Sequence, residues 1–203
     1  MFFGERMARR DFKSYLRPGL RRDARRLADW AAAAGREGEN VLEVGGGIGA
    51  IQAELVRSGA ANGTVVDVVP AWQPYAAELA RRSGIETRTR FVVADLAVEP
   101  DAVDAADVVA LRRVVCCSPY GPRLLGVAAG LTRRILVASY PRRTRPIRVA
   151  AWLQNRAFAL LRREFRVFVH DPVELERAAR EHGLSRTHVH RGRVWESVAF
   201  ERV

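Results

Sequence analysis

The sequence predicts an α/β protein with a doubly wound, mostly parallel sheet and helices on both faces. Along most of the chain, short valine-rich apolar runs alternate with segments of helical periodicity. Such runs are typical of strands that are buried on both faces. The end of the chain differs, because two short strands flank Arg191-Gly192-Arg193 and predict a C-terminal antiparallel hairpin at one edge of the sheet.

The length of 203 residues predicts a single domain over residues 1–203. Residues 1–38 are expected to form an N-terminal helical cap of two helices, which break at Arg17-Pro18-Gly19. In the second of these helices, apolar side chains fall on one face and arginines cover the other. That pattern predicts a helix that packs against the rest of the domain.

The remaining elements follow in alternation. Strands are expected over 41–44, 64–69, 91–94, 107–111 and 134–140, with hairpin strands over 187–190 and 194–200. Helices are expected over 51–56, 71–82, 124–128, 146–163 and 171–183. Pro74 falls in the first turn of its helix, where proline is tolerated, and Asp171 is expected to be the N-cap before Pro172.

The formal net charge of +11 favours partners that carry phosphate or carboxylate. Lys13 is the only lysine, and the arginines are spread along the chain in pairs without a long basic tract. Solvated helix faces account for that distribution. A nucleic-acid partner is therefore possible but not favoured, and the oligomeric state cannot be read from the sequence.

Cys116 and Cys117 are adjacent and lie in an apolar run, so they are expected to be small buried side chains. Two cysteines cannot form a disulfide framework, and no residues near them have the spacing of metal ligands. No signal peptide follows Met1, and no apolar run is long enough to cross a bilayer. We therefore expect a cytoplasmic protein without a bound metal and without a membrane partner.

The first strand ends in the glycine-rich run Gly45-Gly46-Gly47-Ile48-Gly49, and a helix follows at once. A strand, a glycine turn and a helix form a nucleotide-sized site, because glycines let the backbone approach a ligand and the helix offers unpaired N–H groups. Gly45, Gly47 and Ala50 also satisfy the dinucleotide pattern G-x-G-x-x-G/A. The glycines alone therefore do not choose the cofactor.

Three carboxylates occur at or near the ends of the first three strands, namely Glu43, Asp67 and Asp95. The carboxyl ends of parallel strands share one edge of the sheet, where ligands bind. Asp67 is suited to accept hydrogen bonds from ribose hydroxyls, and Asp95 to accept one from an adenine amino group. Glu43 places negative charge near the glycine turn, which favours a cationic ligand over a pyrophosphate.

The ordered set Glu43-x-Gly45-x-Gly47-x-Gly49, Asp67, Ala94-Asp95-Leu96 and Asp107-Val108-Val109 resembles class I S-adenosylmethionine-dependent methyltransferases. The resemblance covers about residues 41–140. It implies a Rossmann-like, seven-stranded sheet of order 3-2-1-4-5-7-6 and S-adenosylmethionine as the cofactor. The residues it assigns to the cofactor, with their neighbours at the strand ends, are Glu43, Gly45, Gly47, Gly49, Asp67, Val68, Asp95 and Leu96.

Two stretches resemble a smaller group within this family. Residues 113–119 and 165–170 look like small bacterial methyltransferases that act on small molecules, and the second is more loosely similar to magnesium-protoporphyrin O-methyltransferases. Those porphyrin enzymes carry a histidine after the fourth strand, where this chain has Cys116-Cys117-Ser118, so no porphyrin substrate is assigned. Ser118-Pro119-Tyr120 resembles the S/N/D-P-P-Y element of amino methyltransferases but lacks its second proline.

Methyl transfer from a sulfonium is an in-line displacement, and a general base is needed only if the acceptor must lose a proton. His170 is the candidate base, with a helix-capping or packing histidine as the equal alternative. Tyr140 is placed to orient an acceptor unless it is a buried aromatic, and Tyr120 is a candidate only if it lines the pocket. Tyr15 and Arg17 lie in the stretch that often closes over the cofactor in such enzymes, and Arg17 is a candidate for the methionine carboxylate.

The first hypothesis is therefore a methyltransferase for the O- or N-methylation of a small molecule. An RNA methyltransferase is supported only by the net charge of +11. An NAD-dependent oxidoreductase fits the glycines but not Glu43 and Asp95. A non-catalytic, methyltransferase-like interaction protein would have a blocked cofactor edge or would bind no cofactor.

Overall fold

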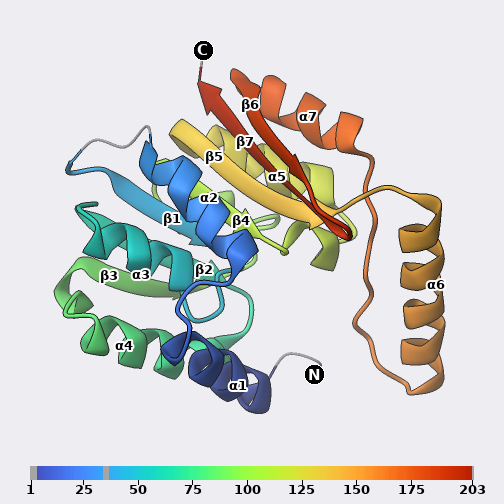
Figure 1. Ribbon diagram of the computed structural model, residues 1–203, viewed down its shortest axis with the longest axis horizontal. Coiled ribbons are helices and arrows are strands. Elements are labelled where there is room, and N and C mark those ends of the chain that lie inside the picture. The colour runs from blue at the N-terminus through green and yellow to red at the C-terminus, as the bar shows by residue number, and fades with distance from the viewer. Residues whose placement is uncertain (1–3, 34–36, 203) are drawn as a thin grey trace.

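The computed structural model describes residues 4–33 and 37–202 and contains one seven-stranded sheet of order β3-β2-β1-β4-β5-β7-β6 (Figure 1). The first five strands pair in parallel, and β7 runs antiparallel to both β5 and β6. Their bounds are β1 Asn40–Val44, β2 Asn62–Asp67, β3 Thr89–Val93, β4 Ala106–Arg112, β5 Thr132–Pro141, β6 Leu184–Arg191 and β7 Trp195–Arg202. The predicted fold class and strand order are confirmed.

Each predicted helix is present, with small shifts at its ends. The helices are α1 Glu5–Leu16, α2 Arg22–Ala33, α3 Ala50–Arg57, α4 Gln73–Arg82, α5 Gly121–Gly130, α6 Arg145–Leu160 and α7 Pro172–Arg180. The predicted strand over 64–69 ends earlier, at Asp67, because the Asp67 carboxylate accepts a hydrogen bond from the Val69 amide and Pro70 begins a 3-10 turn. Asp171 caps α7, as predicted, by accepting from the Val173 amide at 3.0 Å.

Helices cover both faces of the sheet (Figure 1). On one face α2, α3 and α4 pack over the strands, and the buried residues there include Leu27, Ile51 and Leu79. On the other face α5 and α7 pack against the second half of the sheet, around Leu125 and Leu175. The hydrophobic core therefore consists of one layer on each side of the central strands.

The N-terminal segment contributes to both the core and the surface of the domain. Helix α2 buries Ala24, Leu27, Ala28 and Ala31 against the sheet, so it forms part of the helical layer. Helix α1 lies further out, against α4 and the 3-10 turn Pro70–Trp72, where Phe12 is buried. Within the described parts of the chain, no helix has both the length and the apolar character needed to span a bilayer.

Candidate cofactor site

The glycine turn between β1 and α3 has backbone conformations that residues other than glycine rarely adopt. Gly45, Gly47 and Gly49 have positive φ angles of 59°, 57° and 71°. A Cβ atom on Gly45 would lie 2.2 Å from Val114 Cγ2, and one on Gly49 would lie 2.6 Å from Val65 Cγ2. The turn therefore requires glycine for its conformation and also for the close approach of the chain segment that follows β4.

Replacement of Gly45 by alanine should destabilise the fold by about 2–4 kcal/mol, because left-handed strain adds to a steric clash. Gly84→Ala is the matched control, since Gly84 has a φ of +66° but a Cβ there meets nothing within 4 Å. Chemical denaturation of the two variants separates the effects. Equal losses of stability in both would show that the contact with Val114 is unimportant.

Glu43 lies beneath this turn rather than in it. Its side chain is buried, and its Oε2 accepts a hydrogen bond from the Gln52 amide in the first turn of α3 at 2.9 Å. Burial raises the pKa of Glu43 to about 7, although the amides of Gln52 and Ile51 and the charge of Arg112 favour the ionised form. The negative charge of the Glu43 carboxylate stabilises the amino end of α3. A cation bound above the glycine turn would favour the ionised form of Glu43.

Asp67 joins the end of β2 to the glycine turn. Its two carboxylate oxygens accept from the Gly47 amide at 3.0 Å and from the Val69 amide at 2.9 Å. Burial raises the pKa of Asp67, while these two amides favour its ionised form. Each oxygen keeps further acceptor capacity, so the pair suits the two hydroxyls of a ribose. The adjacent Val68 side chain is 58% exposed, which offers an apolar surface beside that carboxylate.

Asp95 follows β3, the neighbour of β2 in the sheet, and its side chain is exposed. Its Oδ1 accepts from the Ala97 amide at 3.0 Å, which fixes the turn after the strand. The Leu96 side chain packs in the core and is only 2% exposed, so a ligand at this edge can meet its backbone but not its side chain. Asp67 and Asp95 thus lie at the ends of adjacent strands, as predicted.

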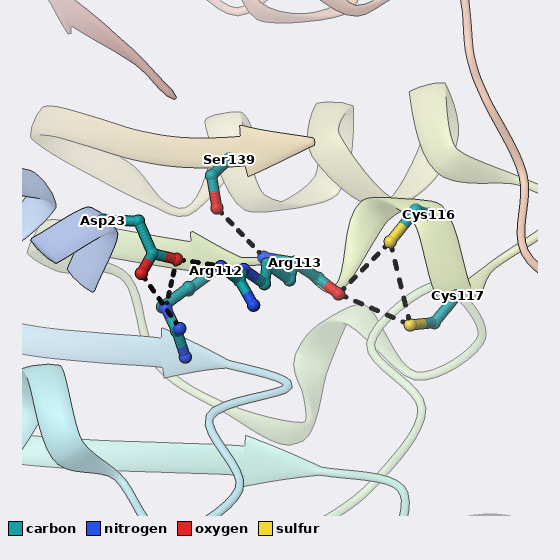
Figure 2. Close-up of polar contacts among 6 residues, drawn as sticks. All are labelled: Asp23, Arg112, Arg113, Cys116, Cys117 and Ser139. Carbon is teal, nitrogen blue, oxygen red and sulfur yellow. Dashed lines mark hydrogen bonds and ion pairs between the residues drawn. The ribbon is translucent and has the colours of Figure 1, made fainter. Parts of the chain in front are cut away.

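The exit of β4 carries an ionic cluster that the sequence did not reveal (Figure 2). The Asp23 carboxylate of α2 accepts from Arg112 Nε at 2.9 Å and Nη2 at 3.2 Å, and Arg113 Nε lies 2.9 Å from the same carboxylate. Arg113 has a φ of 57°, and its guanidinium lies over the Trp195 ring at 4.5 Å. The cluster fixes α2 to the end of β4, next to the glycine turn.

The backbone of Arg113 is held from two sides (Figure 2). Its amide donates to the Ser139 Oγ at 3.2 Å, and its carbonyl accepts from the thiols of Cys116 and Cys117, each at 3.4 Å. These contacts stabilise a left-handed conformation that is costly for a non-glycine residue. Cys116 is buried, as predicted, and Cys117 is partly buried. The only signal in the sequence was an Arg-Arg pair directly after a buried strand.

Burial disfavours the ionised form of Asp23, but hydrogen bonding to Arg112 and the charges of Arg112 and Arg113 outweigh it and hold the pKa of Asp23 below its usual value. Because the pKa of Asp23 is lower in the folded state than in the unfolded state, its ionised carboxylate stabilises the fold. That contribution is present above the unfolded-state pKa and is lost as the pH falls through the folded-state pKa. The link between α2 and β4 is therefore intact at neutral pH.

The fold of this chain is similar to those of solved structures. Magnesium protoporphyrin IX methyltransferase from Synechocystis PCC 6803 superposes with a TM-score of 0.71 at 18% identity, over 89% of this chain and 82% of that one. An O-methyltransferase family 2 protein from Planctomyces limnophilus superposes with a TM-score of 0.71 at 21% identity, over 98% of this chain and 62% of that one. This chain has the class I methyltransferase fold.

The methyltransferase fold does not by itself determine the reaction. The [4+2]-cyclase SpnF also superposes on this chain, with a TM-score of 0.65 at 15% identity, over 87% of this chain and 80% of that one. No protein-family profile and no curated protein matches the sequence. The assignment of a function therefore depends on the site.

His170 is engaged with the turn that follows β4. Its Nε2 lies 3.1 Å from the Val115 carbonyl oxygen and 3.0 Å from the Ser118 carbonyl oxygen. Because both neighbours are acceptors, this nitrogen carries the hydrogen and donates it. The Phe168 amide donates to the Cys116 carbonyl at 2.9 Å beside it. This geometry favours the packing alternative for His170 over the role of a general base through Nε2.

His170→Ala should therefore lower the free energy of unfolding by about 1–3 kcal/mol, because two partly buried carbonyls lose the hydrogen bond from His170. His170→Gln, which keeps an N–H donor, should recover part of that loss. Thermal unfolding of the three proteins measures it. An unchanged melting temperature in His170→Ala, together with lost turnover at saturating cofactor and acceptor, would instead identify His170 as the base.

The other candidates, Tyr140, Tyr120, Tyr15 and Arg17, occupy different environments. Tyr140 is 2% exposed and belongs to the core, where burial and the nearby Glu196 charge raise its pKa, as expected of a buried aromatic. Tyr120 is 65% exposed at the start of α5. Tyr15 donates to Glu54 at 3.3 Å, and Arg17 is exposed at the end of α1. Among the described residues, no cluster of three or more histidine, cysteine or acidic side chains could hold a metal ion.

Proposed function

We propose that this protein is an S-adenosylmethionine-dependent methyltransferase that methylates oxygen or nitrogen on a small molecule. The observation that carries the proposal is the buried Asp67 carboxylate, which binds the Gly47 amide within a left-handed glycine turn at the carboxyl edge of a methyltransferase fold. That arrangement places carboxylate oxygens, which can accept hydrogen bonds from hydroxyl groups, beside the backbone of the glycine turn. A nucleoside with an amino-acid tail requires both.

The side chains present fit this cofactor. Asp67 would hold the ribose hydroxyls, Val68 would pack against the adenine and Asp95 would accept from its amino group. The turn at Gly45, Gly47 and Gly49 would receive the methionine part. The Glu43 carboxylate beneath it would favour the positive charge of the cofactor. Two structural neighbours are described with bound SAH or SAM, which supports the same choice.

The cofactor supplies an electrophilic methyl group on a sulfonium, so the protein must chiefly align the acceptor and exclude water. The acceptor would lie beyond β4 and β5, where the Arg113 guanidinium lies over the Trp195 ring. His170, Tyr140 and Tyr120 have other environments, so the proposal assigns no base to them. Acceptors that are nucleophilic without a base, such as unprotonated amines and phenolates, are therefore favoured.

The test measures S-adenosylhomocysteine released from S-adenosylmethionine with panels of phenols, amines and carboxylic acids, and with RNA oligonucleotides. We expect turnover with a small molecule and none with RNA, and Asp67→Ala should lower that turnover at least about tenfold when S-adenosylmethionine is below saturation. Turnover with RNA alone would show that the substrate is a nucleic acid, as the net charge of +11 would then indicate. Cofactor binding without turnover on any panel would favour a non-catalytic protein and would contradict the proposal.

A further inference from the structure

Helix α6 stands away from the sheet at the right of Figure 1, beyond the carboxyl end of β5. None of its 16 residues is buried. Its inner face is joined to the following segment by Asn155, whose side-chain amide exchanges two hydrogen bonds of 2.8 Å with the backbone of Val167. A helix with polar residues all round needs no further partner, but α6 is not of that kind.

The outer face of α6 exposes large apolar side chains, with Arg156 among them. Val149, Trp152, Leu153 and Leu160 recur at helical spacing and are 56%, 59%, 56% and 86% exposed, and Leu161 directly after the helix is 65% exposed. Single exposed apolar residues are ordinary, but several large ones on one side of a helix mark an interaction surface. We call this set of side chains the α6 apolar face.

Positive charge surrounds that face. Arg145, Arg148 and Arg156 lie within α6, and no aspartate or glutamate occurs between Asp107 and Glu164. The Arg156 guanidinium lies 5.8 Å from the centre of the Trp152 ring, so basic and aromatic groups share one side of the helix. A helix with a Trp- and Leu-rich face and arginines along it is typical of segments that lie in a membrane interface.

We propose that α6 docks this protein onto the surface of an anionic phospholipid bilayer. Lipid phosphates would meet the arginines, while Trp152 and Leu153 would enter the boundary between headgroups and acyl chains. A second copy of the chain is a poor occupant, because it carries the same arginines and a net charge of +11. Nucleic acid would match the arginines but would leave the apolar side chains in water.

This proposal revises the expectation of no membrane partner, which rested on the absence of a spanning segment. The sequence shows an amphipathic stretch over 146–163, but it does not show that the apolar side stays uncovered in the fold. The inference concerns a surface and is independent of the proposed methyl transfer.

The first experiment is co-sedimentation with vesicles of phosphatidylcholine, alone or with phosphatidylglycerol as a third of the lipid. We expect at least about tenfold tighter binding to the anionic vesicles. Arg148→Gln with Arg156→Gln should remove about tenfold of that affinity. The matched control is Arg133→Gln with Arg177→Gln, which has the same net charge and alters exposed positions outside α6, and it should change affinity no more than about twofold. Equal losses in the two double variants would overturn the proposal.

The second experiment follows tryptophan emission. Trp152 is an exposed indole, so anionic vesicles should shift the emission of the protein to the blue, and Trp152→Phe should remove that shift. An emission spectrum that vesicles do not change would overturn docking through the α6 apolar face. Sedimentation of the protein as a dimer that Leu153→Gln dissociates would also overturn it, because a second copy would then be the occupant.

Discussion

Replacement of Asp67 by alanine is expected to weaken S-adenosylmethionine binding at least about tenfold. The variant loses the charged acceptor for the ribose, and it also frees the Gly47 amide, which Asp67 holds at 3.0 Å. The cofactor would then meet a turn that is less firmly placed. Isothermal titration of wild type and variant gives the ratio of the two dissociation constants.

Two further variants separate binding from folding. Asp101→Ala removes an exposed carboxylate on the 3-10 turn Pro100–Ala102 and should leave the affinity unchanged. Asp67→Asn keeps one amide acceptor but no charge, so it should bind with intermediate affinity. Unchanged affinity in Asp67→Ala, with the variant folded by circular dichroism, would disprove the role of Asp67 at the ribose.

Replacement of Glu43 by glutamine is expected to stabilise the protein at pH 8 by about 3 kcal/mol. Burial raises the pKa of Glu43 from 4.5 to about 7, so the folded state binds more protons than the unfolded state between these values. Stability contributed by this group is therefore present below pH 4.5 and is lost as the pH rises through 7. Glutamine is neutral at every pH and can still accept from the Gln52 amide.

Urea unfolding of the wild type and Glu43→Gln at pH 5 and pH 8 measures the difference. The two proteins should be nearly equal at pH 5, and the gap should open towards pH 8. A constant gap would mean that Glu43 does not titrate in this range. If the charge is retained for a cationic ligand, Glu43→Gln will bind S-adenosylmethionine more weakly at pH 8 even though it is the more stable protein.

The fold could be predicted because its signals are local. Valine-rich runs such as 64–69 read as buried strands, and Pro74 and Pro172 mark helix starts that the structure confirms. Asp67 and the three glycines could be placed at one edge because parallel strands end together. The observed end of a strand differs from the predicted one where a side chain binds the backbone. β2, for example, ends at Asp67, because the Asp67 carboxylate accepts from the Val69 amide.

The surroundings of the acceptor could not be predicted, because they depend on contacts between distant segments. His170 could face a cleft or a turn, and only the packing of 165–170 against 115–118 decides between these. Asp23 lies 89 residues before Arg112, and its spacing gives no hint of their pairing. Arg113 and Trp195 likewise meet only because β7 pairs with β5.

The central claim is that the glycine turn and Asp67 bind S-adenosylmethionine, and calorimetric titration with S-adenosylmethionine and NAD side by side tests it most directly. We predict saturable, one-to-one binding of S-adenosylmethionine that Asp67→Ala weakens, and no measurable binding of NAD. Binding of NAD in place of S-adenosylmethionine would identify a dinucleotide site and would contradict the claim, as would the binding of neither.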